Sequence, residues 1–307
     1  MSSAPAQPVL VLLSHPVHGN PTQYMMEKAL EHHELDWRYL SLDIAAEDLE
    51  DAVRGIRGLG FAGGHCAEPY KQSVIPLLNR VSEKAEMIGA VNLIIREEDE
   101  LVGENTEGRG FARSLARLLE TPEDAPAEEE STENEPAEEQ SSDKEPAERK
   151  AVLLGAGRMA RAIGAELADE GIGELVIVNR DPEPARDLAK LLAEKFQVAT
   201  SAVHWEEDYE LPEDVDLLIN ATSIGGEDPD ARVPLVLDNL SAKTIVADVT
   251  INPPQTRFLD EAAERGCRTL DGLSMYIDQV SDGFELWTGT TPDQTVIREA
   301  VEEFLEV

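Results

Sequence analysis

Short apolar runs alternate with amphipathic stretches along the first third of this chain. Apolar runs at residues 9–13, 37–42 and 59–62 predict strands, and the apolar spacing over 21–33 and 46–57 predicts helices. A strand, a crossover helix and a further strand form a βαβ unit, which requires parallel strands. The first third therefore predicts an α/β domain built on a parallel sheet.

The middle of the chain departs from this pattern. Residues 91–96 and 100–103 predict a β-hairpin, and residues 106–119 predict a helix. Residues 121–149 carry almost no large apolar side chain, so they cannot bury enough surface to offset the entropy of ordering. We expect a disordered acidic insertion there, without a function of its own.

A second alternating series begins at Ala151 and continues through the rest of the chain. We expect strands at 151–154, 174–178, 215–219, 244–248 and 268–270, and helices at 159–169, 183–195, 273–287 and 292–304. Strands joined through helices in this way form a doubly wound parallel sheet. At 307 residues the chain exceeds one ordinary core, so the pattern predicts two α/β domains.

The chain is strongly acidic. Its 26 Lys and Arg against 63 Asp and Glu give a net charge of −37, and acids lie on almost every predicted helix. This charge repels nucleic acids and anionic membranes, so we expect neither as a partner. High salt relieves the self-repulsion of an acidic surface. The composition therefore suggests a halophile with a salt-rich cytoplasm.

Several absences in the sequence also narrow the class of protein. Cys66 and Cys267 are too few and too far apart for a disulfide framework, and no histidine spacing is typical of a metal site. The N-terminus lacks a signal-peptide pattern, and no segment reaches the length of a membrane span. We expect a soluble cytoplasmic protein with reduced thiols and no metal.

A glycine-rich loop follows the apolar run that ends at Leu154. Its residues Gly155, Ala156, Gly157, Arg158, Met159 and Ala160 fit the G-x-G-x-x-G/A pattern. The glycines of this pattern let the backbone approach a pyrophosphate, and the following helix supplies free N–H groups. A plain tight turn is the alternative, but the order of strand, loop and helix favours dinucleotide binding.

The next predicted strand leads into Asn179, Arg180 and Asp181, where the adenosine ribose of a dinucleotide would lie. An arginine here accommodates the 2′-phosphate of NADP, whereas an acid bonds the 2′-hydroxyl of NAD. Asn179 and Arg180 therefore favour NADP, while Asp181 leaves NAD open. Asp181 can equally well cap a helix that opens at Pro182.

Lys71 is a candidate for proton transfer. It follows a Pro-Tyr pair, and we expect a helix to begin near Gln72. A lysine at a helix N-terminus opposes the macrodipole, so it is a poor choice for stability alone. A positioned lysine can serve as a general acid or base. The alternative is an ordinary solvated surface lysine.

Eight ordered blocks resemble the shikimate dehydrogenase family over nearly the whole chain. They are Pro-Xaa-Lys ending at Lys71, Gly-Ala-Val-Asn at 89–92, Asn-Thr-acid-Gly at 105–108, the loop at 155–157, Asn179-Arg180, Asn-Ala-Thr-Ser at 220–223, Asp271-Gly272 with Met275, and Gln279 through Gly289. The resemblance implies a substrate-binding catalytic domain over 1–107 and a Rossmann-type NADP domain over 108–270. Residues 271–307 would return to the first domain as helices.

The resemblance also implies roles for single residues. Lys71 would be the catalytic acid/base, and Glu107 stands where the family has its partner aspartate. Asn92 and Gln279 would bond the hydroxyls of the cyclohexene acid. The cofactor would be held by the glycine-rich loop at 155–160 together with Asn179, Arg180 and Thr222, with Gly272 and Met275 beside the nicotinamide.

The substrate pocket departs from the family pattern. The loop at 18–21 lacks the two serines that the family offers to a carboxylate, Ala67 stands where a threonine is usual, and Ile251 replaces a tyrosine. His18 and His65 could replace the serines as donors to a carboxylate. Loop or packing roles for both histidines are the alternative.

The resemblance implies reversible, NADP-dependent reduction of 3-dehydroshikimate to shikimate in the biosynthesis of chorismate and aromatic amino acids. One alternative is a paralogue that acts on quinate or another polyol acid, with NAD as an option. A second is a dinucleotide-binding regulatory protein without catalysis. We expect a small-molecule substrate and a monomer or homodimer.

Overall fold

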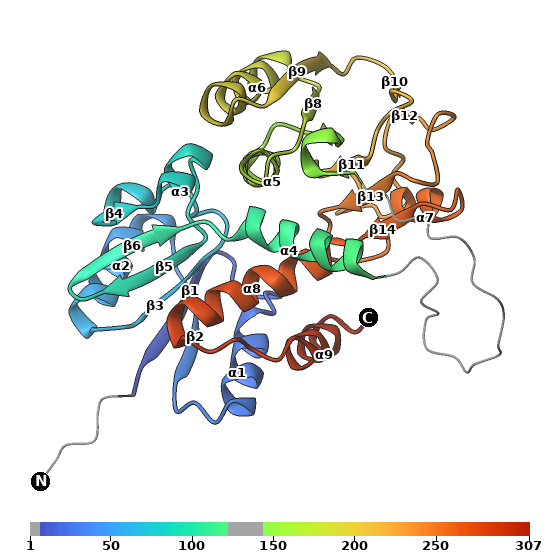
Figure 1. The fold of residues 1–307 in the computed structure, drawn as a ribbon. Helices are drawn as coiled ribbons and strands as arrows, with labels where there is room; N and C mark the ends of the chain where they lie inside the picture. The colour runs from blue at the N-terminus through green and yellow to red at the C-terminus, as the bar shows by residue number, and fades with distance from the viewer. Residues whose placement is uncertain (1–6, 122–143) are drawn as a thin grey trace, which may run out of the picture. The chain divides into compact units, whose positions relative to one another are not determined.

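The computed structural model describes residues 7–121 and 144–307, which divide into two compact units (Figure 1). The first unit comprises Met1–Phe111, Arg161–Ala165 and Leu273–Val307, and the second comprises Ala112–Ala160 and Glu166–Gly272. Most of the predicted acidic insertion, residues 122–143, lies outside the described residues. Its last residues, 144–149, contain a 3₁₀ turn at Pro146–Glu148.

The first unit is built on one mixed sheet. Its elements are β1 (Val9–Ser14), α1 (Thr22–His32), β2 (Arg38–Asp43), a 3₁₀ turn (Ala46–Asp48), α2 (Leu49–Leu59), β3 (Gly63–Cys66), a 3₁₀ turn (Ile75–Leu77), β4 (Arg80–Val81), α3 (Glu83–Ile88), β5 (Leu93–Glu97), β6 (Glu100–Glu104), the start of α4 (Glu107–Glu120), most of α8 (Gly272–Thr288), and α9 (Gln294–Leu305). The strand order is β2-β1-β3-β5-β6-β4. The pairs β1–β2 and β1–β3 are parallel, and the predicted hairpin forms the antiparallel pair β5–β6.

One predicted strand of the first unit was wrong. The apolar run at 59–62 predicted a strand, but Leu59 ends α2, and Gly60 closes that helix with a left-handed φ of 72°. The strand β3 lies a few residues later, in Gly63–Cys66, and is fully buried at the centre of the sheet. Gly63 and Gly64 serve close packing here, because a Cβ on Gly64 would lie 2.1 Å from the carbonyl oxygen of Val11. Strand β3 therefore lacks the apolar signal of an ordinary central strand.

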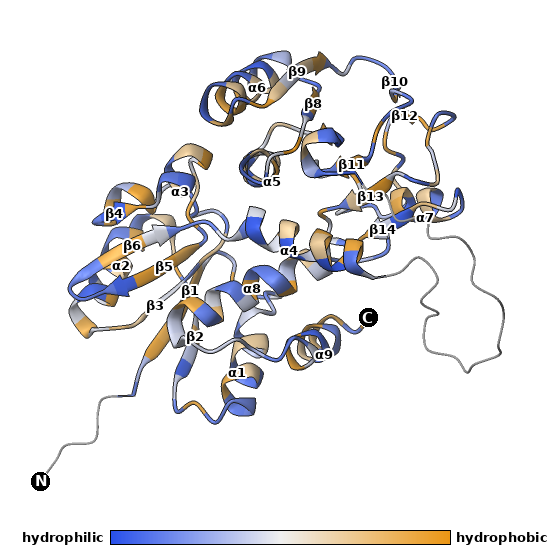
Figure 2. Ribbon diagram, in the orientation of Figure 1, coloured by the Kyte–Doolittle hydropathy of each residue, from blue (hydrophilic) through white to orange (hydrophobic). Residues whose placement is uncertain are grey.

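Helix α9 packs on α1 in the first unit. Helix α8 contacts strand β5 of the sheet through Gly283, which lies against the Leu93 side chain. The indole N–H of Trp287 in α8 donates to the carbonyl oxygen of Ile94 in β5, at 3.0 Å. The core on the other side of the sheet contains Val53 and Ile56 of α2 packed with Val11 and Ile94 of the strands. Apolar residues concentrate in strands such as β5 and β6, and the helices carry both polar and apolar residues (Figure 2). The sheet fixes the ends of β1, β3 and β6 and the start of β5. The candidate residues His18, Lys71, Glu107 and Asn92 lie in the segments next to these positions.

The second unit contains the predicted doubly wound sheet. Its elements are β7 (Lys150–Leu154), α5 (Arg158–Asp169), β8 (Glu174–Asn179), α6 (Pro182–Phe196), β9 (Ala199–His204), β10 (Tyr209–Glu210), β11 (Leu217–Asn220), β12 (Leu235–Val236), β13 (Ile245–Asp248), α7 (Arg257–Ala263) and β14 (Arg268–Leu270). The order β14-β13-β11-β7-β8-β9 is parallel throughout and reverses direction at β7. This is the Rossmann order, and it confirms the α/β fold class. The edge strand β9 carries little apolar signal and was not predicted.

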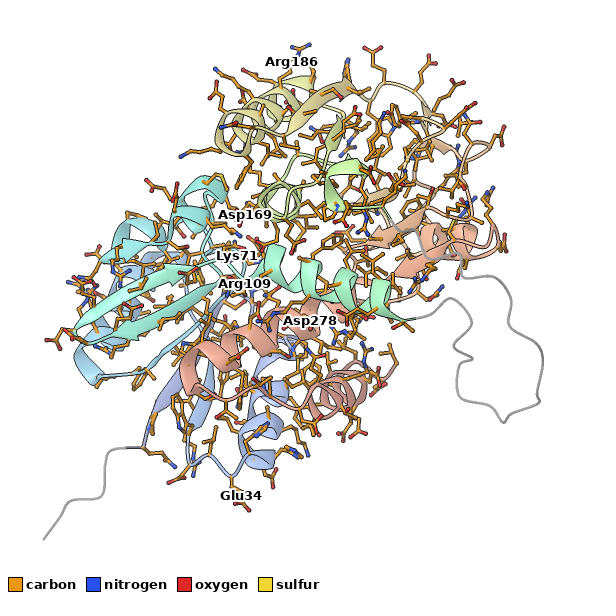
Figure 3. The ribbon with its side chains drawn as sticks, in the orientation of Figure 1. Glu34, Lys71, Arg109, Asp169, Arg186 and Asp278 are labelled. Carbon is orange, nitrogen blue, oxygen red and sulfur yellow. The ribbon has the colours of Figure 1, made fainter. Side chains whose placement is uncertain are left out.

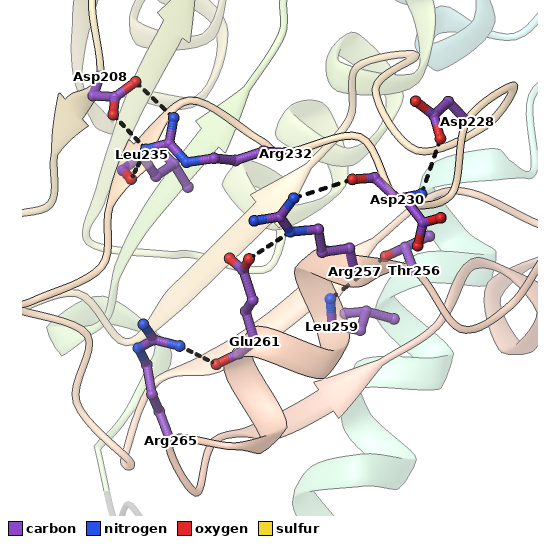
Figure 4. Close-up of polar contacts among 10 residues, drawn as sticks. All are labelled: Asp208, Asp228, Asp230, Arg232, Leu235, Thr256, Arg257, Leu259, Glu261 and Arg265. Atoms are coloured by element: carbon purple, nitrogen blue, oxygen red, sulfur yellow. Dashed lines mark hydrogen bonds and ion pairs between the residues drawn. The ribbon is translucent and has the colours of Figure 1, made fainter.

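Arginines bound to acids and carbonyl groups hold the segment around α7 (Figure 4). Arg232 makes two hydrogen bonds to the carboxylate of Asp208, and Arg257 bonds Glu261 one turn along α7 at 2.7 Å. The Asp208 pKa is lowered by the hydrogen bond from Arg232 and by its positive charge. These exposed pairs contribute little individually, but they keep part of the acid-rich surface neutral.

None of the helices in the described part of the chain is long and apolar enough to span a membrane. Residues 7–121 and 144–307 also bring together no group of His, Cys, Asp and Glu that could hold a metal ion.

Candidate active site

Lys71 lies in a turn, and the helix expected from Gln72 does not form. Pro76 explains the difference, because a proline inside a helix over this stretch would remove a hydrogen bond and clash with the preceding turn. Other contacts hold the turn instead. The buried Tyr70 ring donates its hydroxyl to the carbonyl oxygen of Ile44, and the carbonyl oxygen of Lys71 accepts from the Val91 N–H at 2.8 Å. Lys71 is thus positioned by tertiary contacts.

Lys71 and Glu107 form an ion pair, with the lysine Nζ donating to Oε1 of the glutamate. The Glu107 side chain is 2% exposed and that of Lys71 is 17% exposed, so the pair opens to solvent on the lysine side. Glu107 begins α4, where a negative charge is favoured by the helix dipole. Asn105 supports the same turn by accepting from the Glu107 N–H at 3.0 Å. Figure 3 shows Lys71 close to this first turn of α4.

Asn92 and Gln279 lie beside this pair. The buried Asn92 amide exchanges two hydrogen bonds with Thr106, donating to its hydroxyl and accepting from its N–H, both at 2.9 Å. The Thr106 hydroxyl also lies 3.4 Å from the carbonyl oxygen of Gln279 in α8. Lys71, Glu107, Asn92 and Gln279, which are far apart in sequence, are thereby brought together in one unit. A lysine held by a buried carboxylate can transfer a proton to a bound oxygen.

His65 and His18 are placed differently. His65 is 4% exposed, its Nδ1 lies 2.8 Å from the hydroxyl of Tyr39, and its ring meets Trp287 edge-on at 4.8 Å between centroids. Burial, and then the charge of Lys71, lower the His65 pKa to about 3, so the ring is neutral near pH 7. This placement favours the packing alternative for His65. His18 is exposed in the loop between β1 and α1, and its role stays a prediction.

A hydrogen-bonded group of three residues was missed by the sequence reasoning. The Thr22 hydroxyl lies 2.6 Å from both the side-chain amide oxygen Oδ1 of Asn20 and the Tyr276 hydroxyl. The Thr22 N–H also donates to Oδ1 of Asn20, at 2.9 Å. Thr22 and Tyr276 are 254 residues apart. No local pattern could have linked them.

The glycine-rich loop of the second unit is shaped for a phosphate group. Gly155 has a φ of +105°, and a Cβ there would lie 2.8 Å from the carbonyl oxygen of Ala221, so only glycine suits this position. Gly157 precedes α5, its Cβ position faces open space, and α5 has no side-chain cap. Free N–H groups at an open helix N-terminus bind phosphate. The loop therefore fits the pyrophosphate of a dinucleotide.

Asn179, Arg180 and Asp181, at the end of β8 and just after it, have different hydrogen-bond partners. Asp181 caps α6 by accepting from the Glu183 N–H at 3.0 Å, which confirms the capping alternative. Asn179 donates to the carbonyl oxygen of Asp181 at 2.8 Å. Arg180 is exposed, makes no hydrogen bond to any described residue, and lines a cavity of about 200 Å³ with Trp205. Its guanidinium is therefore free to meet a phosphate.

The three remaining candidate cofactor-binding residues are Thr222, Gly272 and Met275. Thr222 donates its hydroxyl to Asn220 at 2.7 Å and accepts from the Ile224 N–H, which shapes the loop after β11. A Cβ on Gly272 would lie 2.4 Å from the carbonyl oxygen of Thr250, so the start of α8 needs a glycine. Met275 is buried. Contacts of these residues with a nicotinamide stay predictions.

Comparisons with known proteins agree with this arrangement. Residues 12–94 match the shikimate dehydrogenase substrate binding domain, and residues 137–227 match the shikimate/quinate 5-dehydrogenase domain. The shikimate dehydrogenase (NADP⁺) of Methanopyrus kandleri is 37% identical, covering 97% of this chain and 96% of the relative.

Two solved structures are also similar over nearly their full length. The ligand-free 5-ketofructose reductase of a Gluconobacter species is 38% identical with a TM-score of 0.86, covering 98% of this chain and 99% of that one. The shikimate 5-dehydrogenase of Thermus thermophilus, in complex with NADP(H) and shikimate, is 30% identical with a TM-score of 0.76, covering 97% and 100%. On the strength of the family match and the full-length identity, the chain belongs to the shikimate dehydrogenase family.

Proposed function

We propose that this protein is an NADP-dependent oxidoreductase that interconverts 3-dehydroshikimate and shikimate, on the route to chorismate and the aromatic amino acids. The observation that carries the proposal is the ion pair of Lys71 and Glu107, largely buried beside Asn92 and Gln279. The relatives named shikimate dehydrogenase (NADP⁺) support it, since they match 96–97% of this chain.

The ion pair suggests how the protein handles the proton. Glu107 holds the ammonium group of Lys71 at the one open side of the pair. From there Lys71 donates a proton to the ketone oxygen during reduction and recovers it from the hydroxyl during oxidation. NADPH, when bound, supplies the hydride that completes the conversion of the ketone to a secondary alcohol. Asn92 and Gln279 orient the substrate through its other hydroxyl groups.

The cofactor would be held by the second unit. The loop from Gly155 to Ala160 offers backbone N–H groups to the pyrophosphate, and Arg180 offers its free guanidinium to the 2′-phosphate. Asp181 caps α6 through one carboxylate oxygen. The free guanidinium of Arg180 and the capping role of Asp181 favour NADP over NAD.

The cellular setting is also part of the proposal. The net charge of −37 with only 26 basic residues is suited to a salt-rich cytoplasm, as in a halophile. We place the protein there, as a monomer or homodimer with a small-molecule substrate.

A second candidate activity is reduction of an uncharged sugar ketone. It is favoured by the 5-ketofructose reductase, which is more similar to this chain in identity and TM-score than the Thermus thermophilus shikimate dehydrogenase. Quinate or another polyol acid is a third substrate option within the same chemistry.

Steady-state kinetics test the proposal. Purified protein in molar KCl is offered shikimate, quinate and 5-ketofructose with each nicotinamide cofactor, and the change in reduced cofactor is followed by absorbance. We expect NADP-dependent turnover that falls by about 10²–10⁴-fold in Lys71→Met. Cofactor binding without turnover of any substrate, unchanged in Lys71→Met, would instead support the regulatory alternative.

A further inference from the structure

We propose that Glu207 is a specificity-determining residue for the cofactor, which opposes Arg180 at the 2′-phosphate of NADPH and makes the preference for NADPH over NADH rise with salt concentration. The inference rests on the proposed NADP-dependent function. It adds a residue that sets how tightly NADPH binds and the sign of the response to salt. All residues that carry it lie in the second unit.

Strand pairing places the residues that follow β9 beside Arg180. Strands β8 and β9 run parallel at one edge of the sheet, with Asn179 opposite His204 at their carboxyl ends. The Trp205 N–H donates to the carbonyl oxygen of Asn179 at 3.0 Å. The segment after β9 therefore starts next to the segment after β8, where an arginine accommodates the 2′-phosphate of a dinucleotide.

A cavity of about 200 Å³ joins these two segments. Its lining residues are Arg180, Trp205, Glu206, Glu207, Asp208, Ile224 and Pro234. Trp205 is 7% exposed, and its indole N–H donates to the carbonyl oxygen of Pro234 at 2.9 Å, so the chain is firmly held at this point. Glu207 follows two residues later and is exposed. Its carboxylate therefore belongs to the same cavity as the guanidinium of Arg180.

The three acids of the cavity differ in their partners. Asp208 accepts two hydrogen bonds from Arg232 (Figure 4), which neutralises its charge. Glu206 has the imidazole Nδ1 of His204 at 3.0 Å. Glu207 makes no hydrogen bond or ion pair with any residue of 7–121 and 144–307. Glu207 therefore keeps an uncompensated negative charge at the cavity.

Salt acts differently on the attraction by Arg180 and on the repulsion by Glu207. A sphere of this volume is roughly 7 Å across, and the Debye length is about 10 Å at 0.1 M salt and about 3 Å at 1 M. Repulsion across the cavity therefore acts in dilute buffer and is largely screened in molar salt. A guanidinium in contact with a phosphate keeps more of its attraction. The 2′-phosphate should thus bind more tightly as salt is raised, whereas an arginine–phosphate contact without nearby acids weakens.

The first test measures cofactor binding without turnover. The Kd values of NADPH and NADH are determined by fluorescence titration at low and at molar KCl. Their ratio isolates the 2′-phosphate, the one group by which the two cofactors differ. We expect the preference, the Kd of NADH divided by that of NADPH, to rise by about threefold to tenfold with KCl. A preference that falls or stays constant would overturn the inference and leave the oxidoreductase function standing. Failure to bind either cofactor at any KCl concentration would overturn the proposed function itself.

The second test removes the carboxylate. Glu207→Gln keeps the size of the side chain and removes its charge, so at low KCl it should tighten NADPH binding by about threefold to tenfold and leave NADH binding unchanged. In molar KCl the variant and the wild type should bind NADPH alike, because salt already screens the repulsion. Glu213→Gln is the matched control. It removes an exposed carboxylate ahead of β11, at the opposite edge of the sheet, and should leave the preference unchanged.

Sucrose keeps the three proteins folded in the low-salt titrations, because osmolytes favour the compact state without screening charge. Thermal melting checks that each protein is folded under these conditions. A Glu207→Gln protein with the wild-type preference at low KCl would refute the role of Glu207. An equal gain in Glu213→Gln would assign the effect to the net charge of the chain and overturn the inference as well.

Discussion

The contact between α4 and α8 determines where Glu107 and Gln279 lie, and Gly110→Ala perturbs it. A Cβ on Gly110 would lie 2.8 Å from both the N atom of Gln279 and the carbonyl oxygen of Met275. Because ordinary contacts begin near 3.4 Å, the two helices must separate by about 0.6 Å. The obstructing atoms are backbone, so no side-chain rotation can relieve the clash.

Two opposing effects determine how much Gly110→Ala changes the free energy of unfolding. Overpacking costs about 1–3 kcal/mol, and replacing glycine by alanine in a helix returns about 0.5–1 kcal/mol. We expect a net loss in the free energy of unfolding of about 0.5–2 kcal/mol. The loss in kcat/KM should be larger than the loss in stability alone suggests, since a displacement near 1 Å in an active site can cost about a hundredfold in rate. The assay is kcat/KM at saturating NADPH, paired with urea unfolding in molar KCl.

Gly55→Ala is the matched control. It makes the same substitution in α2, where a Cβ meets nothing within 4 Å. This variant should gain stability by about 0.5–1 kcal/mol and keep wild-type kcat/KM. If Gly110→Ala shows the same gain and the same activity, the close packing of α4 on α8 is not what positions the site.

The remaining predictions concern cofactor choice, acid stability and salt. Arg180→Ala should raise the KM for NADPH by roughly tenfold to a hundredfold and change that for NADH little, because only NADPH carries the phosphate; equal losses for both cofactors would contradict the role of Arg180. The His65 pKa is about 3 in the fold against an ordinary 6.5, so the unfolded chain binds a proton first and stability is lost as pH falls from 6.5 toward 3. In His65→Gln, urea unfolding across this window should lack that part of the pH dependence, and identical pH profiles for both proteins would refute the assignment. The melting temperature should rise from low salt to molar KCl as the self-repulsion of 63 acids is screened, and a melting temperature independent of KCl would remove the halophile hypothesis.

Sequence patterns predicted an element correctly wherever a few neighbouring residues determine it. The glycine-rich loop, the helix that Asp181 caps and the apolar strands β7, β8 and β13 are all encoded within a few residues of themselves, and the structure has them in place. The pattern failed at β3, whose Gly63–Cys66 has neither apolar alternation nor β-branched residues. That strand exists because its neighbours β1 and β5 pair with it on both sides.

The sequence by itself determined the α/β class and the glycine-rich loop and named Lys71 and Glu107 as candidates for proton transfer, since periodicity and short motifs depend only on near neighbours along the chain. Tertiary structure alone decided that Lys71 lies in a turn held by Tyr70 and Val91, and that His65 is buried and neutral. It also joined Tyr276 to Thr22 across 254 residues. Burial, hydrogen bonding and charge at these positions come from residues distant in sequence, so only the folded chain specifies them.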